Sequence, residues 1–202
     1  MAFSDFKYPA VLTDLGLTEV TAPNLFGHVA PLPPTVRLTE TLAANLPLAS
    51  AGSSEAARNA WLVGPILSDV WGRYGGRICL TAGVEFDADP AAKLTGLCDF
   101  LIGRYPQVTY VKAPAVVIVE AKRDNLVVGL GQCISAMVGA ERYNRREGHA
   151  TDIVYGCVTT GINWLFLTLA GTTLALDLTE YSVAQVDRIL GILVHMIGPI
   201  PA

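Results

Sequence analysis

A carboxylate and an amine stand two residues apart at the end of an apolar run, where together they can support phosphodiester chemistry. Glu120 and Lys122 follow the apolar residues 115–119. Side chains alternate between the two faces of a strand, so both charged groups point to the same side. A buried acid and base cost free energy unless they are paired or used. The pair therefore indicates a site where a divalent cation could assist cleavage.

The run that carries this pair is short and rich in β-branched residues, which is typical of a strand buried on both faces. Further strands are predicted over 77–86, 94–102, 152–159, 162–169 and 173–178. Helices are predicted over 35–45, 55–71 with a kink at Pro65, 125–144 and 183–197. This order of a helix, three strands, a helix and more strands predicts an α/β domain.

The chain length suits a single domain with an N-terminal elaboration. Residues 1–52 show no candidate catalytic or ligand-binding pattern. They are predicted to form an extension that packs on the core or contacts a second copy. Residues 53–202 are predicted to form the functional domain. The last helix, residues 183–197, is apolar on more than one face, which predicts either deep burial or a homodimer contact.

Composition limits the class of protein. With 51% apolar and 16% charged residues, the 202-residue chain can bury a large core and is not disordered. No apolar run is long enough to span a bilayer, and the N-terminus lacks the pattern of a signal peptide. The four cysteines are scattered without zinc-ligand spacing. We therefore expect a cytoplasmic protein with reduced thiols and no membrane partner.

The net charge of −4 argues against a protein that coats nucleic acid without specificity. Its distribution is uneven, because residues 55–149 hold eleven Lys and Arg against ten Asp and Glu. The remainder holds three against eight. If DNA binds to this chain, we expect it to bind to the middle region.

Five residues of the middle region resemble the pattern of the PD-(D/E)xK nuclease superfamily. They are Glu55, Asp99, Glu120, Lys122 and Gln132. Asp99 lies in a G-x-x-D segment on the strand before Glu120-Ala-Lys122, and the residues from Glu55 resemble the first helix of the nuclease-like domain in type I restriction motor subunits. The resemblance covers residues 53–160. It implies a restriction endonuclease-like fold, with a mixed central sheet flanked by helices.

The resemblance also implies roles for the residues around the predicted site. Asp99 and Glu120, on adjacent strands, would bind Mg²⁺ through carboxylate oxygens, with Mn²⁺ as a substitute. The backbone carbonyl of Ala121 would supply another oxygen. Lys122 would orient the attacking water and offset the charge of the transition state. The resemblance thus implies a Mg²⁺-dependent endonuclease that acts on DNA.

Two further residues complete the implied site. Glu55 would reach the metal through water or orient Lys122, although an acid in a first helical turn also suits the helix dipole. Gln132 would hydrogen-bond to substrate or to Lys122. Cys98 stands where the superfamily often has Pro. Ala136 replaces the Tyr of the RecB-type branch, so the chain is not assigned to that exonuclease group.

Other interpretations of the same residues stay open. Glu120 and Lys122 could form a structural ion pair with no catalytic role. A protein that keeps the fold but lacks activity would act as a nucleic-acid-binding or protein-interaction module. Metal binding separates the two, because only the first function requires the acids to hold a cation.

Overall fold

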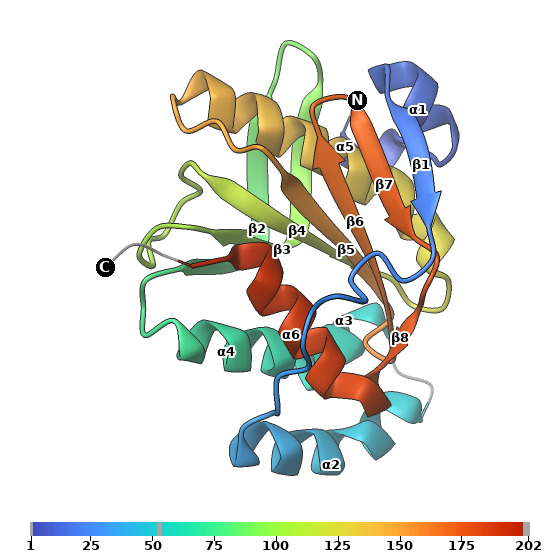
Figure 1. Ribbon diagram of the computed structural model, residues 1–202, viewed down its shortest axis with the longest axis vertical. Helices are drawn as coiled ribbons and strands as arrows, with labels where there is room; N and C mark the ends of the chain where they lie inside the picture. The colour runs from blue at the N-terminus through green and yellow to red at the C-terminus, as the bar shows by residue number, and fades with distance from the viewer. Residues whose placement is uncertain (1, 52–53, 200–202) are drawn as a thin grey trace.

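Figure 1 shows the chain as a computed structural model, in which residues 2–51 and 54–199 are described. These residues form an eight-stranded sheet in the order β1-β7-β6-β5-β4-β3-β2, with β8 beside β6. The strands are β1 (Thr18–Ala22), β2 (Cys79–Asp89), β3 (Leu94–Gly103), β4 (Ala115–Ala121), β5 (Val154–Thr159), β6 (Asn163–Ala170), β7 (Thr173–Asp177) and β8 (Tyr181–Ser182).

The sheet is mixed, and β4 lies near its middle. Strand β4 pairs in parallel with β5 and antiparallel with β3. All seven residues of β4 are buried, as the apolar run predicted. Val117 and Val119 pack into the core on one face, whereas Ile118 packs into the core on the other. The alternation that sets the direction of Glu120 is therefore present in the residues before it.

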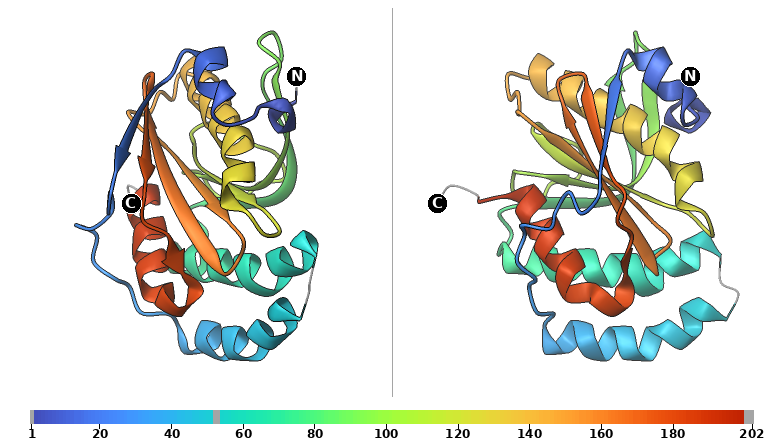
Figure 2. Two further views of the ribbon diagram at one scale, coloured as in Figure 1. Left: turned by 90° about the vertical axis from the view of Figure 1, so that its right-hand side faces the viewer. Right: turned by 45° about the vertical axis from the view of Figure 1, so that its right-hand side comes forward.

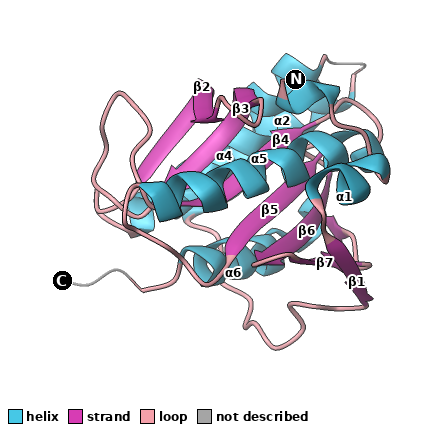
Figure 3. Cartoon of the chain, turned by 90° about the horizontal axis from the view of Figure 1, so that it is seen from above, coloured by secondary structure: helices cyan, strands magenta, loops and turns pink. Residues whose placement is uncertain are grey.

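Helices cover both faces of this sheet (Figures 2 and 3). Helix α5 (Leu126–Arg146) crosses one face, while α4 (Gly64–Arg73) and α6 (Val186–Ile197) cover the other. Helix α2 (Val36–Ser50) lies outside α4. The short elements are α1 (Ala10–Leu15), α3 (Glu55–Arg58), η1 (Phe3–Asp5), η3 (Val183–Gln185) and the π-helical turn η2 (Asn59–Val63). The predicted class, α/β with a mixed central sheet between helices, is confirmed.

The single kinked helix predicted before the first central strand is instead three segments, α3, η2 and α4. The irregularity precedes Pro65, because Gly64 donates its N–H to the carbonyl of Asn59 in a π-helical turn. Pro65 has no N–H to offer the carbonyl of Trp61, four residues earlier. The side-chain amide of Asn45 donates to that carbonyl at 2.9 Å. A contact with α2 thus satisfies the group that the proline leaves free.

The N-terminal region is more closely joined to the sheet than its sequence indicated. Strand β1, which was not predicted, lies at the sheet edge in parallel with β7. Helix α2 continues through Pro47 to Ser50, although its end was predicted at residue 45. Ala49, beyond the proline, is fully buried, so packing overrides the local preference. The predicted boundary between residues 52 and 53 lies outside the described residues.

Helix α6 is buried within the chain. Ile189, Leu190, Ile192, Leu193, Met196 and Ile197 are each 0% exposed. The sheet lies on one side of α6, and the loop 26–32 crosses its outer side (Figure 1). Leu32 donates its N–H to the carbonyl of Asp187 at 2.8 Å. Deep burial therefore accounts for the excess of apolar residues, and the homodimer stays a prediction.

None of the helices in the described ranges combines the length and the apolar character that a membrane span requires.

Candidate functional site

The candidate site begins where β3 and β4 separate. Their ladder includes the pair Phe100 and Val119 but does not continue to the next pair. In its place, the carboxylate oxygen Oδ2 of Asp99 accepts the backbone N–H of Ala121 at 2.8 Å. A side-chain acceptor thus substitutes for a strand carbonyl and fixes Asp99 beside the end of β4.

Lys122 follows directly after β4 and joins the two acids. Its backbone N–H donates to the carbonyl of Thr159 on β5 at 2.8 Å. Its Nζ lies 3.7 Å from Oε2 of Glu120 and 4.0 Å from Oδ2 of Asp99. We call Asp99, Glu120 and Lys122 the strand-end cluster. Asp99 and Lys122 keep 17% and 15% of their side chains exposed, so the cluster opens narrowly to solvent.

Helix α5 closes one side of the cluster through a glycine. A Cβ added at Gly129 would lie 2.6 Å from Cγ1 of Val158 and 2.9 Å from Cγ of Lys122. The glycine therefore lets the helix approach close enough to hold the lysine stem. No role is predicted for Gly129 from the sequence, although a glycine inside a helix is unfavourable and often marks close packing.

The far end of α5 is also fixed to β4. The side chain of Asn144 accepts the N–H of Ala115 at 2.8 Å and donates to its carbonyl at 2.7 Å. Asn144 is fully buried, and this two-way contact supplies partners for the backbone of Ala115, which pairs with Gly103 on β3 but precedes the ladder between β4 and β5. The helix is thus aligned with the strand that carries Glu120.

Glu120 has an unusual environment for an acid. It is 0% exposed, and neither carboxylate oxygen has a hydrogen-bond partner among the described residues. Burial, followed by the negative charge of Asp99, raises the pKa of Glu120 well above its usual range, while the amine of Lys122 acts in the opposite direction. The ionised form is therefore costly unless a cation compensates it.

Two buried thiols near Glu120 are held in the protonated form. Burial and then the negative charge of Glu120 raise the pKa of both Cys98 and Cys133. A thiol must ionise to act as a nucleophile or a soft metal ligand. The chemistry available here therefore lies with the carboxylates and the amine.

Gln132 lies on α5 close to β3. Its Nε2 donates to the backbone carbonyl of Leu97 at 3.3 Å, two residues before Asp99. This contact joins the helix to the strand that carries the acid. In the described part of the chain, no hydrogen bond joins Gln132 to the strand-end cluster itself. The glutamine thus fixes the backbone beside the cluster.

Glu55 begins α3, and no described hydrogen bond or ion pair connects it to the strand-end cluster. Arg58 on the same helix provides the connection instead. Its guanidinium donates to the backbone carbonyl of Arg123, and to that of Thr160 at 3.5 Å. Residues three apart share a helix face, so Glu55 lies on the side of α3 that faces these strand ends. Arg58 is not among the site residues predicted from the sequence.

Within residues 2–51 and 54–199, no group of three or more His, Cys, Asp or Glu side chains is arranged to hold a metal ion. The strand-end cluster supplies two such side chains, Asp99 and Glu120. Any further ligand would be a backbone carbonyl, such as that of Ala121, or water.

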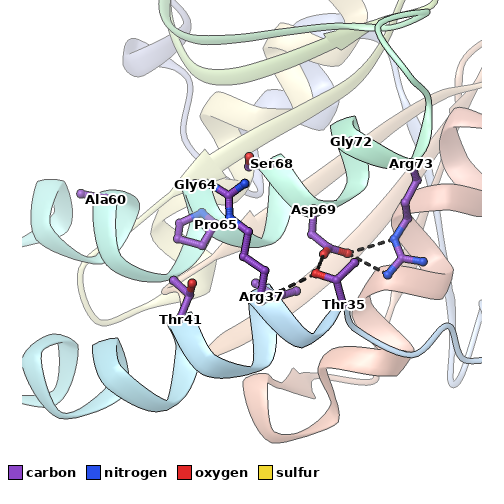
Figure 4. A pocket seen from close by; sticks show the side chains of 11 residues that line it. Thr35, Arg37, Thr41, Ala60, Gly64, Pro65, Ser68, Asp69, Gly72 and Arg73 are labelled. Atoms are coloured by element: carbon purple, nitrogen blue, oxygen red, sulfur yellow. Dashed lines mark hydrogen bonds and ion pairs between the residues drawn. The ribbon is translucent and has the colours of Figure 1, made fainter.

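A second acid–base group lies between α2 and α4, beside a cavity of about 620 Å³ (Figure 4). Asp69 accepts two hydrogen bonds from Arg73, at 2.9 and 2.8 Å, and one from the hydroxyl of Thr35. We call these residues the helix pair site. Arg37 extends from α2 into the cavity. Both carboxylate oxygens of Asp69 therefore accept hydrogen bonds from the protein itself, without a ligand.

No model of a protein family matches the chain, and no curated protein matches it in sequence. The candidate site is therefore interpreted from its own contacts, burial and charges.

Proposed function

We propose that the chain is a Mg²⁺-dependent nuclease with a restriction endonuclease-like fold, which hydrolyses DNA phosphodiester bonds at the strand-end cluster. The observation that supports this most directly is Glu120, whose two oxygens are buried and accept no hydrogen bond among the described residues, beside a second carboxylate and an amine. Buried polar atoms nearly always have partners, so an exception needs an explanation. A cation bound between the two acids would supply one.

The donor set fits a hard divalent cation. Glu120 and Asp99 offer carboxylate oxygens, and the carbonyl of Ala121 lies between Glu120 and Lys122 in sequence. Oxygen ligands of this kind suit Mg²⁺, with Mn²⁺ as a substitute. When bound, the ion would polarise the scissile phosphate and lower the pKa of an attacking water.

Lys122 supplies positive charge at the place where negative charge develops. Its side chain is 15% exposed, and its amine lies within 4.0 Å of both acids. Charge interactions strengthen when water is excluded. The packing of its stem against Gly129 restricts the amine before substrate binds. In this proposal Lys122 orients water and stabilises the transition state.

The other candidate residues take supporting roles. Gln132 positions β3, because its amide is engaged by the carbonyl of Leu97. Glu55 acts through water or not at all, since it makes no described contact with the cluster. The four cysteines are free and buried, which suits the proposed cytoplasmic location.

The alternative is an inactive protein of the same fold that binds nucleic acid or another protein. The closeness of Lys122 to both acids favours it, because one amine neutralises one carboxylate and the raised pKa of Glu120 allows that acid to hold a proton. In that case the cluster is a structural ion pair and has no need of metal.

Cleavage assays with supercoiled, linear and single-stranded DNA, each with Mg²⁺ and with Mn²⁺, test the proposal. We expect cutting that requires metal, together with a melting temperature that rises when either metal is added. The double variant Asp99→Asn, Glu120→Gln should lose both effects. If the wild type cuts none of the substrates and gains no stability from either metal, the nuclease proposal is wrong.

A further inference from the structure

A cavity of about 600 Å³ lies where α4 and α6 end, among the helices on the face of the sheet opposite α5. Its volume is in the range of small-ligand sites, roughly 300–1,000 Å³. We call it the helix-end cavity. The residues that matter for the argument are Leu32, Tyr74, Arg77, Val194, His195 and Gly198. None of them belongs to the strand-end cluster, so a ligand bound here would not depend on the proposed nuclease reaction.

Tyr74 joins the two helix ends that form the cavity. Its hydroxyl donates to the carbonyls of Val194 and Gly198, at 3.1 and 3.2 Å. Tyr74 is 8% exposed, and burial raises the pKa of its hydroxyl, which therefore keeps its proton near neutral pH. The wall between α4 and α6 is thus fixed by the fold itself, as is usual for a site that exists before its ligand arrives.

Two arginines beside this wall have no acid to neutralise them. Arg77 is exposed and donates its Nε to the carbonyl of Tyr74 at 3.1 Å. Arg104 donates Nη2 to the carbonyl of Met196 at 3.5 Å, and a Cβ added at Gly198 would lie 3.3 Å from the same nitrogen. The Nε of Arg104 is buried without a hydrogen-bond partner. In the described part of the chain, both guanidinium groups bond only to backbone carbonyls.

Helix ends account for part of this positive charge. The carbonyls at the C-terminus of a helix carry about half a negative unit charge, which favours a nearby cation. The ends of α4 and α6 therefore offset about one of the two arginine charges. Arg73 also lines the cavity, but Asp69 neutralises it at 2.8 Å. About one positive charge is thus left over beside the cavity.

The rest of the lining is apolar or neutral. Leu32 and Val194 are half-buried and pack against the core of the sheet face that α4 and α6 cover. Burial, and then the nearby His28, lower the pKa of His195. Its ring is therefore neutral near pH 7 and offers a hydrogen bond without adding charge. The cavity thus combines an apolar wall with a single surplus positive charge.

We propose that the helix-end cavity binds a small organic carboxylate, with the acid group at Arg77 and the apolar body against Leu32 and Val194. A planar guanidinium pairs with a carboxylate through two parallel hydrogen bonds. A carboxylate carries one negative charge, which matches the surplus. A phosphate monoester carries about 1.5 to 2 negative charges near pH 7 and would exceed it.

Titrations with benzoate, benzamide and phenyl phosphate, followed by NMR of the ligand at constant ionic strength, test the inference. The three probes share one ring and differ in the charge of the attached group. We expect benzoate to bind saturably and about tenfold more tightly than benzamide. Phenyl phosphate should bind no more tightly than benzoate, because its second charge has no partner.

Arg77→Gln should lose about tenfold in affinity for benzoate and about twofold or less for benzamide. The matched control is Arg145→Gln on α5, where the side chain is 69% exposed and the same charge is removed. It should bind benzoate as the wild type does, which separates a local contact from the general effect of net charge. Arg104→Gln should also weaken benzoate binding. Arg104 is half-buried, so Arg77→Gln provides the test if the Arg104 variant is unstable.

The inference is overturned if benzamide binds as tightly as benzoate, or if Arg77→Gln and Arg145→Gln bind benzoate equally. Absence of saturable binding by both anions would also overturn it, since the two arginines would then serve only the helix ends. Tighter binding of phenyl phosphate than of benzoate, lost in Arg77→Gln, would overturn the assignment to a carboxylate and indicate a phosphate ester instead.

Discussion

Asp69 and Glu120 are both nearly buried acids with a basic residue close by, yet their surroundings differ. The side chain of Asp69 is 4% exposed and accepts hydrogen bonds from Arg73 and Thr35. Glu120 is 0% exposed and accepts none among the described residues. In the folded chain, the acid of the helix pair site has all the hydrogen bonds it needs, whereas the buried acid of the strand-end cluster accepts none. An acid of the second kind is the better candidate for binding a cation.

The difference follows from the elements that carry each acid. Asp69 lies on a helix, where Arg73 one turn later reaches it with a planar, forked donor. Glu120 lies on a central strand under α5, where Asp99 and Lys122 are the charged groups that act on it among the described residues. At Asp69, both Arg73 donors reach Oδ2 and the hydroxyl of Thr35 reaches Oδ1, so each oxygen has a partner. The amine of Lys122 lies 3.7 Å from Oε2 of Glu120, which is too far for a hydrogen bond.

The largest expected effect is on the cleavage rate, and it distinguishes Lys122 of the strand-end cluster from Arg73 of the helix pair site. Lys122→Ala should lower the rate of DNA cleavage by about 10² to 10³-fold, the usual effect of removing a positioned electrostatic group. Metal binding should persist, because both acids remain and a competing positive charge is gone. Single-turnover cleavage and metal-dependent melting measure the two effects.

Arg73→Ala is the control for that prediction. It should leave the cleavage rate of the folded protein unchanged while it lowers stability, because Arg73 donates hydrogen bonds to Asp69 and to the carbonyl of Pro33. Equal loss of rate in both variants would mean that Lys122 acts through the fold.

Neutralising Asp69 should destabilise the protein. Asp69→Asn weakens the hydrogen bonds that Arg73 donates and removes the charge that they neutralise, with an expected loss of about 2 kcal/mol in the free energy of unfolding. Urea denaturation followed by circular dichroism measures the change. An unchanged midpoint would show that the helix pair site contributes little to folding.

Neutralising Glu120 should change the free energy of unfolding in the opposite direction. A raised pKa in the folded protein means that this acid stabilises the fold below its ordinary pKa of 4.5 and loses that contribution as pH rises through the folded value. Without metal, Glu120→Gln should therefore be more stable than the wild type by about 1 kcal/mol near neutral pH. The difference should vanish below about pH 4.

Denaturation of wild type and Glu120→Gln in EDTA, across this range of pH, checks the prediction. Added Mg²⁺ should then stabilise the wild type but not the variant. A variant that is less stable at every pH would indicate a structural ion pair with Lys122 and favour the inactive alternative.

The smallest effect concerns two helical glycines. Gly129→Ala should destabilise the protein by about 1 kcal/mol, since overpacking against Val158 and Lys122 exceeds the gain in helix propensity. Gly72→Ala on α4 has no atom within 4 Å of the added Cβ and should stabilise by about 0.5 kcal/mol. Thermal melting of both variants compares the regions, and two shifts of the same sign would contradict the close packing at Lys122.

Local patterns in the sequence predicted much of the framework. The apolar run before Glu120 indicated a buried central strand because such a run suits a strand covered on both faces. The spacing of Glu120 and Lys122 indicated that they share a face, since side chains alternate along a strand. Strand β1 was missed because its polar, half-exposed residues carry no clear periodicity.

Tertiary structure alone decided how the residues of the site relate. The sequence determined which acids and which amine are present and the direction in which each strand presents them. It could not determine that β3 leaves β4 at Asp99, that Gly129 packs on Lys122, or that Glu120 lacks partners. These features depend on contacts between segments far apart in the chain. Local propensities carry no information about how closely two such segments pack.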